Sequence, residues 1–303
     1  MPVTRRRMAL AAPALALLAA AWRGLPDSNA GARQQVEFEP YRVSESIFML
    51  DSGQGGNIGV CLGDDGVLLI DDQFARTAPA LRAALERLSD EPVAFLLNTH
   101  FHGDHTGGNP ILGEGATILA HDSVRKRLTE PGRDGSAPSP EMLARGLPVL
   151  TYADAITLHV GGQTVRAEHY PACHTDGDTV VFFEPANAVH MGDLFFPGRF
   201  PYIDVESGGS VDGLIAAVET ILGRVDAQTR IIPGHGPLSG KPELAAYLDM
   251  LRDCRSKVAA ALKAGQSTDA MKAANLLADH ADWSWGFISA ERFIDTLVAS
   301  ARH

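Results

Sequence analysis

Cysteine is scarce in this sequence, whose 303 residues contain three: Cys61, Cys173 and Cys254. An odd number spread along the chain excludes a framework of disulfides as the main support of the fold. We expect Cys61, in an apolar strand, and Cys254, in a helix, to be buried as small hydrophobic residues. Cys173 adjoins His174 and could be a metal ligand or a redox-sensitive neighbour, but packing is the favoured interpretation.

Positive charge is also in deficit. Lysine and arginine total 26 against 37 aspartates and glutamates, so the formal net charge is -11 at pH 7. Such an acidic surface repels phosphate backbones, and nucleic acid is not expected as a partner. The glycine-rich segment 53–57 lacks the lysine of a phosphate-binding loop. It is expected to form a lip over a site, with a plain hairpin turn as the alternative.

Long apolar runs are absent except near the N-terminus, where residues 8–22 are rich in Ala and Leu. This run is shorter than the roughly 20 residues that cross a bilayer. It follows the basic head Thr4-Arg5-Arg6-Arg7-Met8, which is similar to a twin-arginine motif, and small-residue cleavage sites lie at 30–32 or 19–21. We expect residues 1–32 to be a cleavable export signal, rather than a membrane anchor or a mitochondrial-type presequence. The mature protein is then expected to be periplasmic or secreted, without stable membrane insertion.

After this region, short apolar segments alternate with amphipathic ones. Strands are expected at 47–50, 57–62, 67–70, 93–97, 117–120, 156–160, 164–168, 179–183, 188–190 and 230–232. Helices are expected at 77–88, 123–128, 211–222, 242–263, 267–277 and 290–301, and a surface excursion at 131–148. Two comparable halves of this kind predict an α/β (α+β) fold in which two mixed sheets pack together with helices outside. No linker divides residues 33–303, which are expected to be a single domain.

The segment Thr99-His100-Phe101-His102-Gly103-Asp104-His105 carries the clearest chemical signal. Imidazoles and a carboxylate at such spacing are typical ligands of a borderline metal such as zinc. Side chains alternate in an extended segment, so His100 and His102 are expected to point the same way. Gly103 lets the backbone bend and aims Asp104 and His105 at a second position. Four residues from one loop cannot close two metal sites, so others must contribute.

Three further candidates each follow a predicted strand. They are His174 in Cys173-His174-Thr175-Asp176, Asp193 in Met191-Gly192-Asp193-Leu194, and His235 in Pro233-Gly234-His235-Gly236. Glycine and proline neighbours suit loops in which the backbone turns sharply. Strand ends that meet at one edge of a sheet are common positions for active sites.

In order and in approximate spacing, these motifs resemble the metallo-β-lactamase superfamily. The resemblance covers roughly residues 43–235 and implies a four-layer αβ/βα sandwich with its site along one edge. It also implies two metal ions. The first would be held by His100, His102 and His174. The second would be held by Asp104, His105 and His235.

Asp193 would bridge the two ions, which suits cations about 3.5–4 Å apart. Two Zn²⁺ ions are expected, with Fe or Mn as alternatives. A hydroxide between the ions would be the nucleophile, because zinc brings the pKa of bound water to about 7. Asp104 would orient this hydroxide as well as bind.

Two residues narrow the reaction that the resemblance implies. The best-known β-lactamases of the superfamily carry Cys where Asp193 stands, whereas Asp is typical of glyoxalase II and other hydrolases. Members that reduce oxygen at a di-iron site carry Glu in place of His102. The expected function is therefore an exported binuclear zinc-dependent hydrolase of a small amide or ester, with a β-lactam or lactone ring as the best guess. A glyoxalase II-like thioester hydrolase, a non-catalytic periplasmic metal- or ligand-binding protein and an iron-dependent oxygenase are the alternatives.

The segment that follows Asp193 is expected to meet the small-molecule substrate. Phe196, Arg199 and Tyr202 combine aromatic walls with one cation, which suits a substrate with a carboxylate. A packed loop with Arg199 in a structural ion pair is the alternative. The C-terminal aromatics Trp283, Trp285 and Phe287 are expected in the core, with a pocket wall as the lesser alternative. Histidines 121, 169 and 190 and aspartates 71, 72, 176 and 178 are candidate partners of the metal-binding side chains, or simple turn and core residues.

Overall fold

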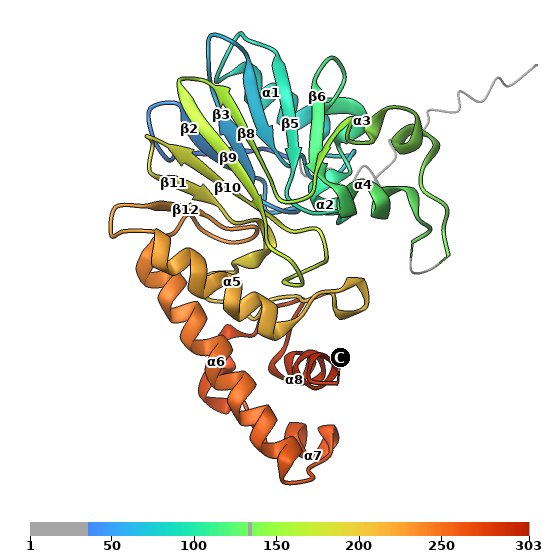
Figure 1. The fold of residues 1–303 in the computed structure, drawn as a ribbon, viewed down its shortest axis with the longest axis vertical. Coiled ribbons are helices and arrows are strands. Elements are labelled where there is room, and N and C mark those ends of the chain that lie inside the picture. The colour runs from blue at the N-terminus through green and yellow to red at the C-terminus, as the bar shows by residue number, and fades with distance from the viewer. Residues whose placement is uncertain (1–35, 133–134, 303) are drawn as a thin grey trace, which may run out of the picture. The chain divides into compact units, whose positions relative to one another are not determined.

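Two β-sheets organise residues 36–132 and 135–302, the part of the chain that this computed structural model describes (Figure 1). The seven-stranded sheet has the order β1 to β7: β1 (Glu39–Arg42), β2 (Ile47–Asp51), β3 (Ile58–Cys61), β4 (Val67–Ile70), β5 (Val93–Asn98), β6 (Thr117–His121) and β7 (Leu150–Tyr152). The five-stranded sheet has the order β12-β11-β10-β9-β8: β8 (Ala155–Val160), β9 (Gln163–His169), β10 (Thr179–Glu184), β11 (Ala188–His190) and β12 (Arg230–Ile232). Neighbours from β1 to β4 are antiparallel and those from β4 to β7 parallel, and in the second sheet only β11 and β12 pair in parallel. Both sheets are mixed, as predicted.

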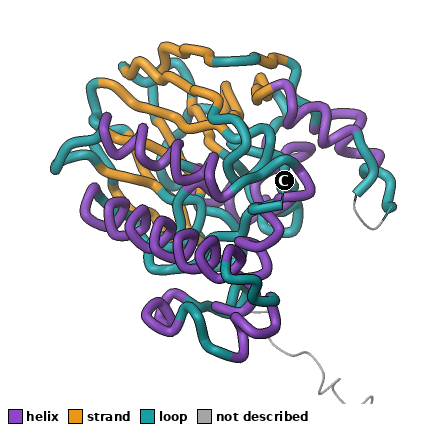
Figure 2. The backbone as a smooth tube through the Cα atoms, turned by 60° about the horizontal axis from the view of Figure 1, so that its bottom comes forward, coloured by secondary structure: helices purple, strands orange, loops and turns teal. Residues whose placement is uncertain are grey.

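Helices flank the two sheets or pack on one another. They are α1 (Ala78–Glu86), α2 (Gly103–Thr106), α3 (Asn109–Leu112), α4 (Asp122–Thr129), α5 (Val211–Arg224), α6 (Lys241–Lys263), α7 (Thr268–Ala273) and α8 (Ala290–Ser300). Helices α5 to α8 gather on one side of the strands (Figure 1), and the long α6 runs alongside α5 (Figure 2). Among the described residues, no helix is both long and apolar enough to cross a membrane.

Strand alternation explains the four layers. On β4, Val67 and Leu69 belong to the core that contains Leu81 of α1, whereas Leu68 and Ile70 face the second sheet. All four strand residues are buried, as expected of a strand covered on both faces. The layer between the sheets contains side chains from both of them, and a third core joins the outer face of the second sheet to α5, α6 and α8. The predicted four-layer αβ/βα sandwich is confirmed.

The differences from the sequence prediction lie at edges and in loops. Strands β1 and β7, which close the two edges of the first sheet, were not predicted, because β1 is exposed at all four positions and β7 has three residues. The segment 131–148 is only partly a surface excursion, since it contains the π-helical turn Met142–Gly146, with Gly146 buried. The carbonyl of Gly146 accepts a hydrogen bond from Asn109 Nδ2 at 2.8 Å. The predicted export signal, 1–32, lies outside the described residues.

The topology brings several strand ends together. Parallel strands end at the same edge of a sheet, so Asp71 after β4 and Thr99 after β5 are neighbours, and Asp71 Oδ1 accepts a hydrogen bond from Thr99 N at 2.7 Å. The parallel pair β11 and β12 brings Gly192 next to Gly234, whose amide donates to the carbonyl of Gly192 at 2.7 Å. These ends carry the candidate site.

Candidate metal centre

The motif 99–105 spans a turn rather than a single extended segment. Strand β5 ends at Asn98, and His102 has extended backbone angles and stands just before α2. Asp104 and His105 lie in the first turn of α2, which Gly103 begins. The ring nitrogens of His100 and His102 nevertheless converge, with Nε2 of the first 3.1 Å from Nδ1 of the second. The predicted convergence is correct, but a turn produces it instead of strand alternation.

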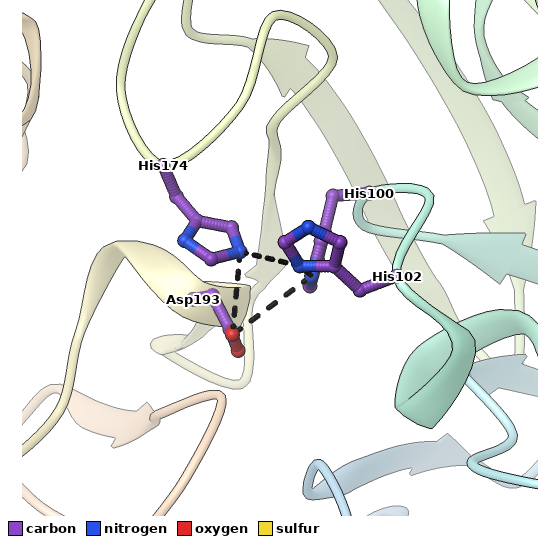
Figure 3. Close-up of side chains that lie close together, drawn as sticks. All are labelled: His100, His102, His174 and Asp193. Atoms are coloured by element: carbon purple, nitrogen blue, oxygen red, sulfur yellow. Dashed lines mark hydrogen bonds and ion pairs between the residues drawn. The ribbon is translucent and has the colours of Figure 1, made fainter. Parts of the chain in front are cut away.

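Four side chains form a first group (Figure 3). His174 Nε2 lies 2.9 Å from His102 Nδ1 and 3.4 Å from Asp193 Oδ2. His100 Nε2 lies 3.8 Å from the same carboxylate oxygen. The segment before β10 supplies His174, and the 3-10 turn after β11 supplies Asp193. Three imidazoles and one carboxylate thus direct one atom each to a common point.

The second group contains Asp104, His105 and His235. Asp104 Oδ2 is 3.4 Å from His235 Nε2 and 3.8 Å from His105 Nε2. Asp193 again faces these atoms, because its Oδ1 lies 3.2 Å from His105 Nε2 and 3.6 Å from His235 Nε2. The two oxygens of Asp193 therefore face one group each.

The donor set fits a divalent metal. In each group the candidate nitrogen and oxygen atoms all lie within 4.8 Å of one another. His105 Nε2 and Asp193 Oδ1 are buried without a hydrogen-bond partner among the described residues, which is costly unless another group satisfies them. Imidazole nitrogen and carboxylate oxygen are typical ligands of zinc and related ions. The structure brings together all seven residues that the sequence singled out.

Hydrogen bonds from outside each group fix the imidazole rings. His105 Nδ1 lies 2.8 Å from Asp71 Oδ2, and His174 Nδ1 lies 2.7 Å from the carbonyl oxygen of Tyr202. Because each Nδ1–H donates outward, Nε2 of each ring faces into the site. Asp71 therefore acts as the candidate partner that the sequence proposed.

Sequence reasoning missed Asp204. Its Oδ2 accepts a hydrogen bond from His102 Nε2 at 3.0 Å, which leaves Nδ1 of that ring for the first group. The carboxylate is 2% exposed and also accepts from Ser207 N at 3.0 Å. Asp204 lies 102 residues from His102 and looks like a turn residue in the sequence, so no local signal could have identified it.

The other candidate partners have structural contacts instead. His121 and His169 stack on each other with ring centroids 3.6 Å apart, and His190 Nδ1 accepts from Gly192 N at 3.1 Å. The carboxylates of Asp72, Asp176 and Asp178 are bonded respectively to Gly108 N, to Arg127 and to Thr175. Cys173 is buried, with its Sγ near the carbonyl oxygens of Pro171 and Gly213, so packing accounts for it.

The two groups differ in their proton affinity. Burial lowers the pKa of His100, His102 and His174, the last to about 3, so these rings are neutral at pH 7. Burial also lowers the pKa of His105 and His235, but the Asp193 and Asp104 carboxylates outweigh it and raise the pKa of both, that of His235 to about 9. Burial raises the pKa of Asp104, but His105 and His235 outweigh it and bring the value to about 2. The second group therefore attracts positive charge.

Two glycines permit the close packing around the site. A Cβ on Gly56 would come within 2.2 Å of the His105 ring, and one on Gly234 would come within 2.0 Å of Asp193 Oδ1. No larger residue fits at either position without moving a candidate metal-binding side chain. The glycines beside the motifs thus serve close approach as well as turning.

A cavity of about 840 Å³ opens over both groups. Asp104, Asp193 and His235 line its floor, and residues 53–55 of the glycine-rich segment form part of its rim. The predicted substrate-contacting residues Phe196, Arg199 and Tyr202 all line it. The expectation of a core position is wrong for Phe287, which is exposed and lines the cavity, as the lesser alternative had it. Trp285 packs against a core and lines the cavity as well, because the segment after Trp283 returns to the site.

Comparisons with known proteins agree with this geometry. The family model of the metallo-beta-lactamase superfamily matches residues 52–235. The 2,4-dinitroanisole O-demethylase subunit alpha of Nocardioides sp. (strain JS1661) is 24% identical over 183 residues, 58% of this chain and 53% of that protein. A hydroxyacylglutathione hydrolase of Gloeobacter violaceus (strain ATCC 29082 / PCC 7421) is 30% identical over 183 residues, 57% of this chain and 61% of that protein. A solved metallo-beta-lactamase from Pontibacter korlensis has a TM-score of 0.59 at 18% identity, covering 72% of this chain and 100% of that one.

The fold and the paired His/Asp groups define a sandwich protein with a divalent-metal site. The family match extends over more than half of the sequence, and the chain belongs to the metallo-beta-lactamase superfamily. It spans little more than half the length of the two curated relatives. The resemblance stated from the motifs is confirmed.

Proposed function

We propose that the protein is a metal-dependent hydrolase with two zinc ions, one in each group. His100, His102 and His174 would hold the first ion and Asp104, His105 and His235 the second, with one oxygen of Asp193 facing each group. The observation that carries this proposal is the orientation of Asp193, whose Oδ2 faces the first group and whose Oδ1 faces the second. Zinc at these positions would supply a water nucleophile that is deprotonated near neutral pH and a Lewis acid for the carbonyl oxygen of the substrate.

The chain's own residues then position the reactants. The Asp104 side chain is 28% exposed and lines the cavity, so its carboxylate accepts a hydrogen bond from the attacking water and orients it. The aromatic walls exclude bulk water around the scissile bond, which strengthens electrostatic interactions there. No serine or cysteine nucleophile is needed, and all three cysteines are buried.

The bond that we propose is cleaved is a carbonyl–heteroatom bond in a small ester, lactone or β-lactam ring. Support comes from the cavity, whose volume suits a drug-sized molecule. A thioester is the second candidate, because a relative 30% identical is a hydroxyacylglutathione hydrolase. Aspartate rather than cysteine at position 193 also favours this candidate, since glyoxalase II carries aspartate there.

Metal removal combined with a substrate panel tests the proposal. The purified protein is stripped with a chelator, reloaded with Zn²⁺ and assayed on a chromogenic β-lactam, lactones, aryl esters and thioesters. We expect hydrolysis of at least one class to disappear on stripping and to return with zinc. Asp193→Ala is expected to bind less zinc and to lose hydrolysis.

The matched control is Asp64→Ala in the exposed turn before β4, at the opposite end of that strand from Asp71. It is expected to keep both the metal content and the activity. Hydrolysis that survives in Asp193→Ala, or tight zinc binding without turnover on the whole panel, would overturn the hydrolase proposal. The second result would favour a metal- or ligand-binding protein.

We also propose that the protein is exported. The support is the basic head Arg5-Arg6-Arg7 followed by the apolar run 8–22. Cell fractionation and N-terminal sequencing of the mature protein test it: a periplasmic or secreted product that begins near residue 33, or near residue 22, is expected. A cytosolic product that retains residue 1 would contradict it.

A further inference from the structure

The wall of the cavity is unusually aromatic for a chain with 7% aromatic residues. Six aromatic side chains line it: Phe74, Phe101, Phe196, Tyr202, Trp285 and Phe287. Phe196 stacks on the candidate metal-binding ring of His235, with centroids 5.4 Å apart and planes 11° apart. The apolar surface therefore begins directly beside the second group.

Two of these aromatics come from the C-terminal part of the chain. Trp285 and Phe287 lie between the 3-10 segment Ala278–Trp283 and α8, outside the residues 52–235 that match the family. Trp285 Nε1 donates to the carbonyl oxygen of Phe200 at 2.9 Å, and Phe200 N donates to that of Trp283 at 2.8 Å. These bonds tie the segment 283–288 to the loop that follows Asp193.

Phe287 is held at the mouth of the cavity. Its carbonyl accepts a hydrogen bond from Arg292 Nη1 at 2.9 Å, and its ring is 5.5 Å from the Tyr202 ring and 5.7 Å from the Trp285 ring. The side chain is nevertheless 47% exposed. A fixed backbone with an exposed aromatic ring at a cavity mouth is a contact surface for a ligand with a flat apolar part.

Arg199 adds a positive charge to this wall. Its guanidinium carbon lies 5.3 Å from the centroid of the Trp285 ring, and the side chain is half-buried. Within residues 36–132 and 135–302, no carboxylate lies within ion-pair distance of it. A planar guanidinium beside an aromatic face is suited to bind a carboxylate with two parallel hydrogen bonds.

We propose that Arg199 and the segment 284–288 select substrates in which an aryl group and an anionic group lie close together. The aryl ring packs against Trp285 and Phe287, the carboxylate meets Arg199, and the scissile carbonyl faces Asp193 at the floor. This inference rests on the proposed hydrolase function for the position of the scissile bond. The binding preference itself depends only on the wall.

Binding of non-hydrolysable probes tests the preference without turnover. The probes are 2-naphthylacetate, its neutral analogue 2-naphthylacetamide, and cyclohexylacetate, measured by calorimetry on zinc-loaded and on chelator-stripped protein. We expect the naphthyl acid to bind about 10- to 100-fold more tightly than its amide, the range of one charge-assisted pair. We also expect it to bind more tightly than cyclohexylacetate.

Two substitutions separate the two contacts. Arg199→Gln is expected to make the naphthyl acid and amide bind equally, in stripped as well as in zinc-loaded protein. Phe287→Ala is expected to weaken naphthylacetate about tenfold and to remove its advantage over cyclohexylacetate, whereas Phe287→Tyr retains both. The matched controls are Arg255→Gln on α6 and Tyr41→Ala on β1, both exposed and outside the cavity lining, and neither is expected to change binding.

Two results would overturn the inference. In the first, the preference for the acid vanishes on stripping and Arg199→Gln has no effect, because the carboxylate then binds the metal ions. In the second, Phe287→Ala leaves the aryl preference intact. If the probes bind in the expected pattern but no substrate is hydrolysed, the hydrolase proposal is overturned and the binding preference remains in place.

Discussion

Proton release should distinguish the two groups when the metal-stripped protein binds zinc. The pKa of His235 is raised to about 9 by Asp193 and Asp104 acting against burial, so this ring carries a proton at pH 7. The same carboxylates raise the pKa of His105. A metal ion needs the unprotonated ring nitrogen, so binding to the second group must displace these protons.

The size of the effect follows from the distance between pH and pKa. At pH 7, a pKa of about 9 for His235 lowers the apparent zinc affinity of its group about 100-fold, or about 2.7 kcal/mol. Each proton displaced changes the affinity about tenfold per pH unit, so the proton of His235 alone predicts a tenfold loss for each unit by which the pH falls below about 9, and a proton on His105 adds to this loss. The first group behaves differently, because burial lowers the pKa of His174 to about 3 and also lowers the pKa values of His100 and His102. Its affinity should be nearly independent of pH between 6 and 8.

Calorimetry in two buffers with different ionisation enthalpies measures this directly. Zinc is titrated into the stripped protein at pH 6.5 and 7.5, and the difference in heat between buffers gives the protons released in each binding event. We expect one event without proton release and a second, weaker event with one to two. His235→Ala should remove the second event, whereas His159→Ala, an exposed histidine on β8, should change nothing. Equal proton release in both events, or a second event without protons, would refute the assignment of charge to the two groups.

Three further outcomes are expected. Asp71→Asn removes the charge that fixes His105 and should lower zinc affinity of the second group about 10- to 100-fold by calorimetry; unchanged affinity would contradict the role of this contact. Gly234→Ala places a Cβ 2.0 Å from Asp193 Oδ1. It should lower the free energy of unfolding by about 1–3 kcal/mol, measured by thermal unfolding, and reduce the zinc content. A variant with unchanged melting temperature and metal content would contradict this packing. All three thiols are buried, and burial raises the pKa of Cys61 to about 11. Ellman's reagent at pH 8 should therefore label none of them until denaturant is added, and rapid labelling of the native protein would contradict this expectation.

The sequence predicted the fold through periodicity and the site through rare residue types. Apolar runs such as 67–70 and 93–97 identify strands buried on both faces, and these lie within one residue of the observed β4 and β5. Strand β1 was not predicted, because its side chains are all exposed and do not alternate between buried and exposed positions. Its place in the sheet comes from backbone pairing with β2, which side-chain patterns do not reveal.

The candidate site shows the same division. Histidines and aspartates beside glycines are chemically distinctive, so the sequence could single out all seven candidate metal-binding residues. Asp204 could not be found, because its hydrogen bond to His102 joins residues 102 positions apart. For Trp285 and Phe287 the sequence favoured a core position and left a pocket wall as the lesser alternative, since an aromatic side chain is compatible with both. Only the return of the segment 283–288 to the loop after Asp193 distinguishes these two roles.

This arrangement separates the reaction from the choice of substrate along the chain. The candidate metal-binding residues all lie between His100 and His235, within the region that matches the family. Phe287 and Trp285, by contrast, follow that region and line the cavity wall, where the Trp285 ring lies 6.4 Å from the ring of His235. Because the indole Nε1 of Trp285 donates to the carbonyl oxygen of Phe200 rather than to any of the seven residues, substitutions of the Phe287 side chain can change the wall without moving the floor. Phe287→Ala should therefore change KM for aryl substrates while the zinc content and the two proton-release events stay as in the unmodified protein.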